Sequence, residues 1–362
     1  MNIFSGSGNS RFSNSVVFRS AFVITLLIGS ILYGLVVCHH PSLTDTKGGH
    51  SGEGDVKFYQ IVIEQIHTGK SYYSVAGNEL RRRNYPTSSV FNWRLPTLAW
   101  LLGQLPSIRT GQVFAFILAL TTLFIWSKVF HRYQYAIWQA ILGSLILSGP
   151  LCLSLSNFTL FHEFWAGTLI SLSLGAYARG WRYVSVAAGL MALFLRELSL
   201  PFVCVMMILS YRDGQRREAL MWLMGILAFG GELLLHWSIV SQLITENDKT
   251  LQGGWIVFGG WPFVLNTAQM HPLFMLSPPW ALAIIVPLSL LGVLAWRDGL
   301  GIRIACIVGV YMVAFSIVGR SVNDYWGLMY VFVMFLGLLH APYVLRDLWQ
   351  PLSSVISNKG KI

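Results

Sequence analysis

The run AFVITLLIGSILYGLVVC, residues 21–38, decides the class of fold, because it is long, apolar and without a single charge. A helix needs about 20 such residues to cross the hydrocarbon core of a bilayer. Arg19 stands just before the run, and no A-x-A cleavage pattern follows it. The run is also longer than the apolar core of a typical secretory signal. We therefore expect it to be a retained first membrane span.

The composition of the whole chain also indicates a membrane protein. Of its 362 residues, 54% are hydrophobic and only 11% are charged, which is far from the average of soluble domains. Two polar stretches interrupt the apolar runs, and neither is long enough for a large independent domain. We predict an all-α fold, a polytopic transmembrane helical bundle that forms one domain over residues 1–362. Residues 39–94 would be the first outer loop and 242–278 the second.

The formal net charge of +10 does not indicate a nucleic-acid partner, because the basic residues punctuate the apolar runs and form no single patch. The cysteines have no metal-ligand spacing, so they are expected to be small core residues. No cofactor is predicted, and the need for a divalent metal stays open. The cysteines are Cys38, Cys152, Cys204 and Cys306.

The basic residues also predict the orientation of the spans, since short cytoplasmic loops carry an excess of Lys and Arg. Ten crossings bring these residues to one side, the cytoplasm, and leave both termini there. The basic residues concerned are Lys128, Arg132, Arg179, Arg182, Arg212, Arg216, Arg217, Arg297, Arg303, Arg346, Lys359 and Lys361. The crossings are expected at 20–38, 110–128, 136–153, 160–178, 183–195, 198–211, 219–241, 279–296, 302–319 and 326–345.

The stretch 183–211 is the open point of this topology. One long span there would invert everything that follows, whereas Arg196-Glu197 and Pro201 interrupt the apolar run. An ionised pair within the hydrocarbon is costly, and proline limits how the chain re-enters a helix. We expect two short helices that form a tilted or re-entrant hairpin.

The first outer loop contains a conspicuous acid, Asp55. Apolar residues follow it at helical spacing: Tyr59, Val62, Ile63 and Ile66. This pattern predicts an amphipathic helix that is too short to span and lies along the outer interface with its apolar face toward lipid. Asp55 stands at the start of this helix. It either caps the helix or acts in catalysis at the interface, and the local pattern leaves both open.

Cations follow in the same loop, as Arg81-Arg82-Arg83 and Arg94. Guanidinium groups make charge-assisted, often bidentate bonds to phosphate oxygens. A basic loop that rests on anionic lipid headgroups explains the same residues. Arg94 is the stronger candidate for a phosphate ligand, because Trp93, Leu95 and Pro96 would hold it at the membrane edge.

The order of these features resembles the GT-C superfamily of membrane glycosyltransferases, which use polyprenyl-phosphate-linked sugars, and most of all its bacterial branches. The resemblance covers roughly residues 20–130, and the remainder agrees only in having several spans. The first loop has Glu53-Gly54-Asp55 and no Asp-Asp or Asp-Glu pair, which weakens any metal dependence. The matching elements are Gly54-Asp55, Tyr59, Thr68-Gly69-Lys70-Ser71-Tyr72-Tyr73, Tyr85-Pro86 and Arg94-Leu95-Pro96.

The resemblance implies that Asp55 is a base, or a carboxylate that positions the acceptor, when an acceptor hydroxyl attacks the sugar. It implies a polyprenyl-phosphate-linked sugar as donor, a glycan or lipid as acceptor, contact with membrane lipid, and a place in the bacterial inner (plasma) membrane. Arg94, Arg196 and Arg320 are the candidate cations for the leaving phosphate.

Further candidates for substrate binding are Tyr59, Glu197 and the pair His162-Glu163. The Arg196-Glu197 pair is equally well explained by a mutual salt bridge within the turn, and His162-Glu163 by exposure at the interface. Two other classes of function stay open: a transporter or flippase, which predicts polar groups near the midplane, and a non-catalytic assembly subunit.

Overall fold

The computed structural model describes residues 14–38, 52–251, 253–254 and 256–359; the start of the first outer loop, 39–51, and Lys361 lie outside them. Within these ranges the chain is helical and forms no strand, apart from an isolated bridge between Val257 and Val318. The predicted all-α class is therefore confirmed for this part of the chain.

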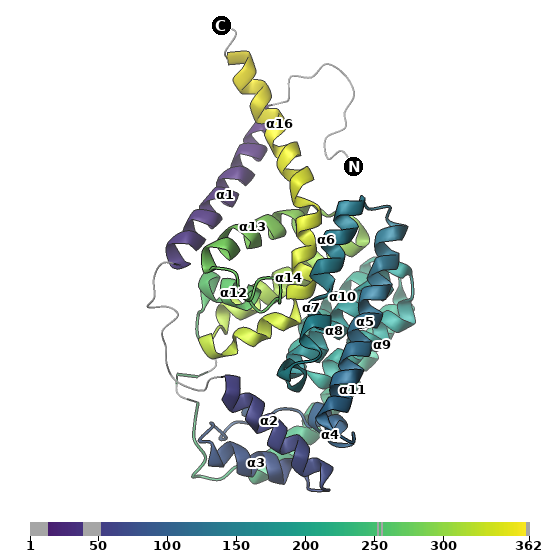
Figure 1. Ribbon diagram of the computed structural model, residues 1–362, viewed down its shortest axis with the longest axis vertical. Helices are drawn as coiled ribbons and strands as arrows, with labels where there is room; N and C mark the ends of the chain where they lie inside the picture. The colour runs from purple at the N-terminus through teal and green to yellow at the C-terminus, as the bar shows by residue number, and fades with distance from the viewer. Residues whose placement is uncertain (1–13, 39–51, 252, 255, 360–362) are drawn as a thin grey trace.

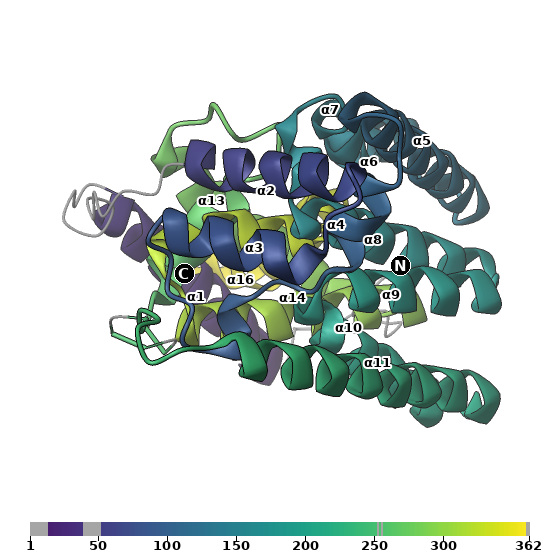
Figure 2. The same ribbon diagram turned by 90° about the horizontal axis from the view of Figure 1, so that it is seen from below.

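The helices form a bundle, with a layer of short helices lying across one end of it (Figures 1 and 2). We call this the α2–α4 layer: α2 (Gly52–His67), α3 (Tyr72–Arg82), η2 (Val90–Asn92) and α4 (Thr97–Gly103). The bundle comprises α1 (Asn14–Cys38), α5 (Ile108–Arg132), α6 (Ile137–Leu147), α7 (Gly149–Leu153), η3 (Asn157–Leu160), α8 (His162–Arg179), α9 (Arg182–Leu195), η4 (Glu197–Ser199), α10 (Leu200–Arg212), α11 (Arg216–Leu243), α12 (Gly260–Ala268), α13 (Pro279–Ala295), α14 (Gly299–Ile317), η5 (Ser321–Met329), α15 (Val331–Met334), η6 (Phe335–Leu339) and α16 (Ala341–Lys359). The start of α1 and the end of α16 project on the side away from the α2–α4 layer (Figure 1).

Several helices have the length and composition to cross a membrane. In the described residues four do so singly: Ser15–Val37, Ile108–Arg132, Arg216–Leu243 and Gly299–Ile317. A fifth is possible if the pair Val322–Met329 and Val331–Leu339, which is bent by 51°, counts as one span. These helices indicate a membrane protein with several spans. The shorter apolar helices α9 and α13 fall below the length of a full crossing on their own.

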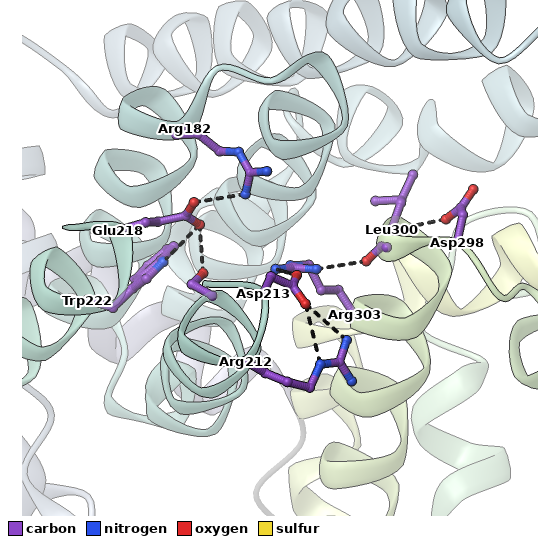
Figure 3. Close-up of polar contacts among 10 residues, drawn as sticks. Arg182, Arg212, Asp213, Glu218, Trp222, Asp298, Leu300 and Arg303 are labelled. Atoms are coloured by element: carbon purple, nitrogen blue, oxygen red, sulfur yellow. Dashed lines mark hydrogen bonds and ion pairs between the residues drawn. The ribbon is translucent and has the colours of Figure 1, made fainter. Parts of the chain in front are cut away.

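The stretch 183–211 forms a hairpin. Arg196 adopts an extended backbone conformation that ends α9, and α10 begins four residues later, directly after η4. The start of α9 and the end of α10 meet at Glu218. This residue accepts a hydrogen bond from Arg182 at 2.8 Å and one from Ser210 at 2.8 Å. Figure 3 shows Arg182 and Glu218 close to the Arg212–Asp213–Arg303 contacts at this end of the bundle. Residues 182 and 212 therefore lie at the same end of the molecule.

The predicted crossing at 326–345 is not one straight helix. The chain there runs through η5, α15 and η6 before α16 begins, and Tyr330 leaves the helical conformation at the break. Close backbone contacts surround this broken segment. A side chain at Gly167 would lie 1.9 Å from the carbonyl oxygen of Leu328, and one at Gly292 would lie 1.9 Å from that of Gly337. Glycine thus lets neighbouring helices approach the broken segment, as in other membrane bundles.

Helix α2 forms where the sequence predicts a helix, but its surroundings differ from the prediction. Its apolar residues, Tyr59, Val62, Ile63 and Ile66, are buried in protein, so the expected contact of this face with lipid is wrong. The face is covered because α4 lies against it: a side chain at Gly103 would come within 2.5 Å of Ile66. Residues 242–278, the predicted second outer loop, contain α12, whose Phe263, Val264 and Leu265 are buried.

Candidate functional site

The site is built where the α2–α4 layer meets the start of α8 and the turn after α9. The ring of Tyr59 on α2 lies 5.4 Å from that of His162, the first residue of α8. Glu163 follows on α8 and forms an ion pair of 2.8 Å with Arg196. The structure thus brings together groups that are far apart in the sequence, and most of the predicted site residues are among them.

Asp55 lies in the first turn of α2 and is half-buried. Because α2 begins at Gly52, Asp55 is not the residue that precedes the helix, and the capping interpretation is wrong for this position. A carboxylate in the first turn is still favoured by the positive end of the helix dipole. The hydroxyl of Tyr85 donates a hydrogen bond to the Oδ1 atom of Asp55. Burial, together with this bond, raises the pKa of Tyr85 well above its usual range, so its hydroxyl keeps its proton and acts as the donor.

Arg94 is held by tyrosines from three elements. Its guanidinium donates to the hydroxyl of Tyr325 on η5 at 3.2 Å and more weakly to that of Tyr59 at 3.4 Å. The hydroxyl of Tyr72 donates to its backbone carbonyl at 2.6 Å. Glu197 is the nearest carboxylate, 3.9 Å from the Nη1 atom. The hydroxyls are neutral and the ion pair with Glu197 is long, so the charge of Arg94 is only partly neutralised and a further negative group near it would be stabilised.

Arg196, unlike Arg94, forms two ion pairs with carboxylates. It contacts Glu163 at 2.8 Å and Glu197 at a shorter distance, and its side chain is only 1% exposed. Glu163 is equally buried, whereas 34% of the Glu197 side chain is exposed. The charge of this buried guanidinium is balanced by two carboxylates, although its Nε and Nη2 atoms make no hydrogen bond to any described residue. The geometry supports the salt-bridge interpretation of Arg196-Glu197, with Arg196 holding both glutamates in place.

Arg320, directly before η5, is the remaining candidate cation. Its guanidinium approaches Gly253 in the segment before α12: a side chain at Gly253 would meet it at 3.2 Å. The residue of this turn that does reach Arg94 is Tyr325. Tyr325 also lies within electrostatic range of Asp55 and Glu163.

Two contacts fix the layer above α11. Thr97 donates to Glu232 at 2.7 Å, and the hydroxyl of Tyr73 lies 3.1 Å from the Nδ1 atom of His236. Each of these ionisable groups on a long apolar helix thereby gains one partner from the layer, while Glu232 Oε2 and His236 Nε2 make no hydrogen bond within the part of the chain that the structure describes. Among the described residues, no group of three or more His, Cys, Asp or Glu side chains could hold a metal ion.

The arrangement offers a carboxylate with one hydrogen-bond donor, and a cation whose charge is only partly neutralised. Comparison of the chain with protein-family models, with curated proteins and with solved structures finds no match. The chemistry of the side chains is therefore what a functional proposal must rest on.

Proposed function

We propose that the protein is a membrane glycosyltransferase, which moves a sugar from a polyprenyl-phosphate donor to a glycan or lipid acceptor at the outer face of the membrane. The observation that carries this proposal is that Asp55 and Arg94 both lie within electrostatic range of Tyr59 and Tyr325, while Glu197 lies 3.9 Å from Arg94. A site at the end of a bundle can be reached both from lipid and from water. The loose resemblance of residues 20–130 to the GT-C superfamily points to the same chemistry.

In the proposed reaction the acceptor hydroxyl oxygen bonds to the anomeric carbon of the donor sugar. The bond from that carbon to the lipid phosphate oxygen breaks, and the phosphate leaves with the electron pair. Asp55 takes the proton of the hydroxyl, as a general base must lie within hydrogen-bond reach of it. Arg94 stabilises the negative charge on the departing phosphate.

The other site residues have supporting roles in this proposal. Arg196 and Glu163 position the partly exposed carboxylate of Glu197, which would accept hydrogen bonds from sugar hydroxyls. Tyr59 and His162 form the wall behind Arg94. We assign Arg320 to the segment around Gly253 and not to the reacting centre.

The proposal includes a topology. The chain crosses a bacterial inner membrane about ten times, with α9 and α10 as two short crossings through a locally thinned bilayer and with the α2–α4 layer outside. The basic end of the bundle, defined by Arg182, Arg212 and Arg303, then faces the cytoplasm together with both termini. No divalent metal is required in this mechanism.

The test is the substitution Asp55→Asn in cells that lack the native gene. We expect transfer to fall by at least about 100-fold, as for the loss of a general base, and the lipid-linked sugar to accumulate. Glu64→Gln, an exposed carboxylate on the same helix, is the matched control and should transfer normally. Full transfer by normally inserted Asp55→Asn protein would disprove the proposed role of Asp55.

A transporter is the second candidate, because broken helices often line the substrate sites of transporters. The break between η5 and α15 has this form. Its interior, however, is filled by protein: the hydroxyl of Tyr330 bonds to Thr267 at 2.8 Å, and its ring stacks on that of Tyr311. This packing favours a rigid structural role for the break, and hence the enzyme.

A further inference from the structure

A small polar cavity lies beside the candidate site, between the end of α3 and the segment that follows α11. Its volume is about 160 Å³, small for a drug-sized ligand and suited to a single sugar ring. Its lining side chains are polar or charged, apart from the ring of Tyr85. Asn84, Tyr85 and Thr87 contribute from one side, and Thr245, Asn247 and Lys249 from the other.

The walls of this cavity are fixed by the ion pair between Arg81 and Asp248. Arg81 donates to both carboxylate oxygens, at 2.7 and 2.8 Å, and Thr87 adds a third bond of 2.7 Å. These bonds hold the pKa of Asp248 well below its usual range, mainly because of Arg81. Backbone bonds from Thr87 and Ser88 to the carbonyl of Lys249 join the two segments directly. The cavity is therefore preorganised, which lowers the entropic cost of binding.

Several polar groups of the lining remain available to a ligand. Within the described part of the chain, the amide of Asn247 and the hydroxyl of Thr245 make no side-chain hydrogen bond, and both residues are exposed. Lys249 donates to the amide oxygen of Asn84 at 2.8 Å, which leaves the amide nitrogen of Asn84 free to donate. Amides and hydroxyls both donate and accept, as the hydroxyls of a sugar do.

An anion fits this lining less well than a sugar. Arg81 is neutralised by the carboxylate of Asp248, which itself lies in the wall and would repel a phosphate. Lys249 is then the one lining cation not paired with an acid among the described residues. Uncharged groups make up most of the remaining surface.

Tyr85 connects the cavity to Asp55. It contributes to the lining, and its hydroxyl donates to the carboxylate of Asp55. We infer that the cavity binds a sugar ring of an oligosaccharide acceptor, the ring next to the one whose hydroxyl reacts at Asp55. The inference rests on the proposed function and adds to it that the acceptor carries at least two sugars.

The experiment measures binding of the full chain, in detergent, to an array of immobilised mono-, di- and trisaccharides. We expect some of the di- or trisaccharides to bind. Asn247→Trp, which fills the cavity, and Asn247→Ala, which removes the amide, should both weaken this binding, the latter by about tenfold. Because Asn247 takes no part in the Arg81–Asp248 contacts, both variants should fold. Glu246→Gln, exposed next to it but outside the cavity, is the control.

The outcomes separate the two proposals. If Asp55→Asn abolishes transfer but keeps glycan binding, and Asn247→Trp loses binding, both are supported. If Asp55→Asn still transfers sugar while Asn247→Trp loses binding, the cavity is a glycan site and the proposed function fails. Equal binding by wild type and Asn247→Trp, no binding to any saccharide, or displacement of the saccharide by inorganic phosphate would overturn the inference.

Discussion

At the scale of single residues, the Tyr85 hydroxyl is the contact that tests how Asp55 works. It donates to the carboxylate oxygen that would receive the acceptor proton or share it with the acceptor. Tyr85→Phe removes this bond and keeps the ring. We expect kcat to fall about tenfold with KM for the donor unchanged, because a lost side-chain hydrogen bond of this kind costs about 1 to 2 kcal/mol.

The kinetic split distinguishes positioning from folding. A variant that only lost stability would give less active enzyme but the same pH profile and the same KM values for both substrates. Tyr183→Phe is the control, because that tyrosine is 74% exposed on α9 and lies at the far end of the hairpin. A normal kcat for Tyr85→Phe would show that the bond has no part in the reaction.

The sequence could predict most of the charged residues of the site and Tyr59, but not the contacts of Tyr85 and Tyr325. Asp55, Arg94 and Glu163 stand out because ionisable groups are rare in an apolar chain. Tyr85 and Tyr325 do not, since the chain has 14 tyrosines and only the fold decides which hydroxyl meets a carboxylate or a guanidinium. Arg320 was predicted as a phosphate ligand because of its residue type. Its position in the chain does not show which residues surround it.

At the scale of helices, glycine decides how closely α13 approaches the broken segment 321–339. A methyl group at Gly292 would lie 1.9 Å from the carbonyl oxygen of Gly337, which is backbone and cannot rotate away. Gly292→Ala should therefore force the helices apart and cost about 3 kcal/mol or more. Thermal unfolding of the purified protein in detergent measures the change.

Gly309 on α14 provides the matched control for this prediction. It also lies inside an apolar helix, but nothing stands within 4 Å of the position a methyl group would take. Gly309→Ala should leave stability unchanged or raise it by up to about 1 kcal/mol, because alanine favours the helix. Equal unfolding temperatures for the two variants would contradict the packing described here.

The positions of helices were easier to predict than their contacts. Apolar runs and their interruptions gave helices near 108–132, 182–195 and 299–317, because periodicity and length are properties of the sequence itself. The break at Tyr330 was missed, since no proline or charge marks it. The buried face of α2 was assigned to lipid because an amphipathic pattern is the same whether lipid or protein covers it.

At the scale of the whole molecule, the hairpin of α9 and α10 determines which ends of helices share a side of the membrane. Arg182 and Ser210 both bond to Glu218, so the start of α9 and the end of α10 are held together. The opposite end of α9 carries Arg196, which bonds to the residues beneath the α2–α4 layer. If the bundle crosses a membrane, these two ends of α9 face opposite compartments.

Single cysteines introduced into a chain without its native cysteines test this topology. We expect Glu64→Cys on α2 to react with a membrane-impermeant maleimide in intact cells. Tyr183→Cys and Arg212→Cys, at the two ends that Glu218 joins, should react only after the membrane is opened. Their shared behaviour follows from the hairpin, because a single span across 183–211 would separate them by the thickness of the bilayer. Labelling of one of these two from outside and of the other from inside would rule out the hairpin, and with it the side of the membrane on which Asp55 and Arg94 are proposed to act.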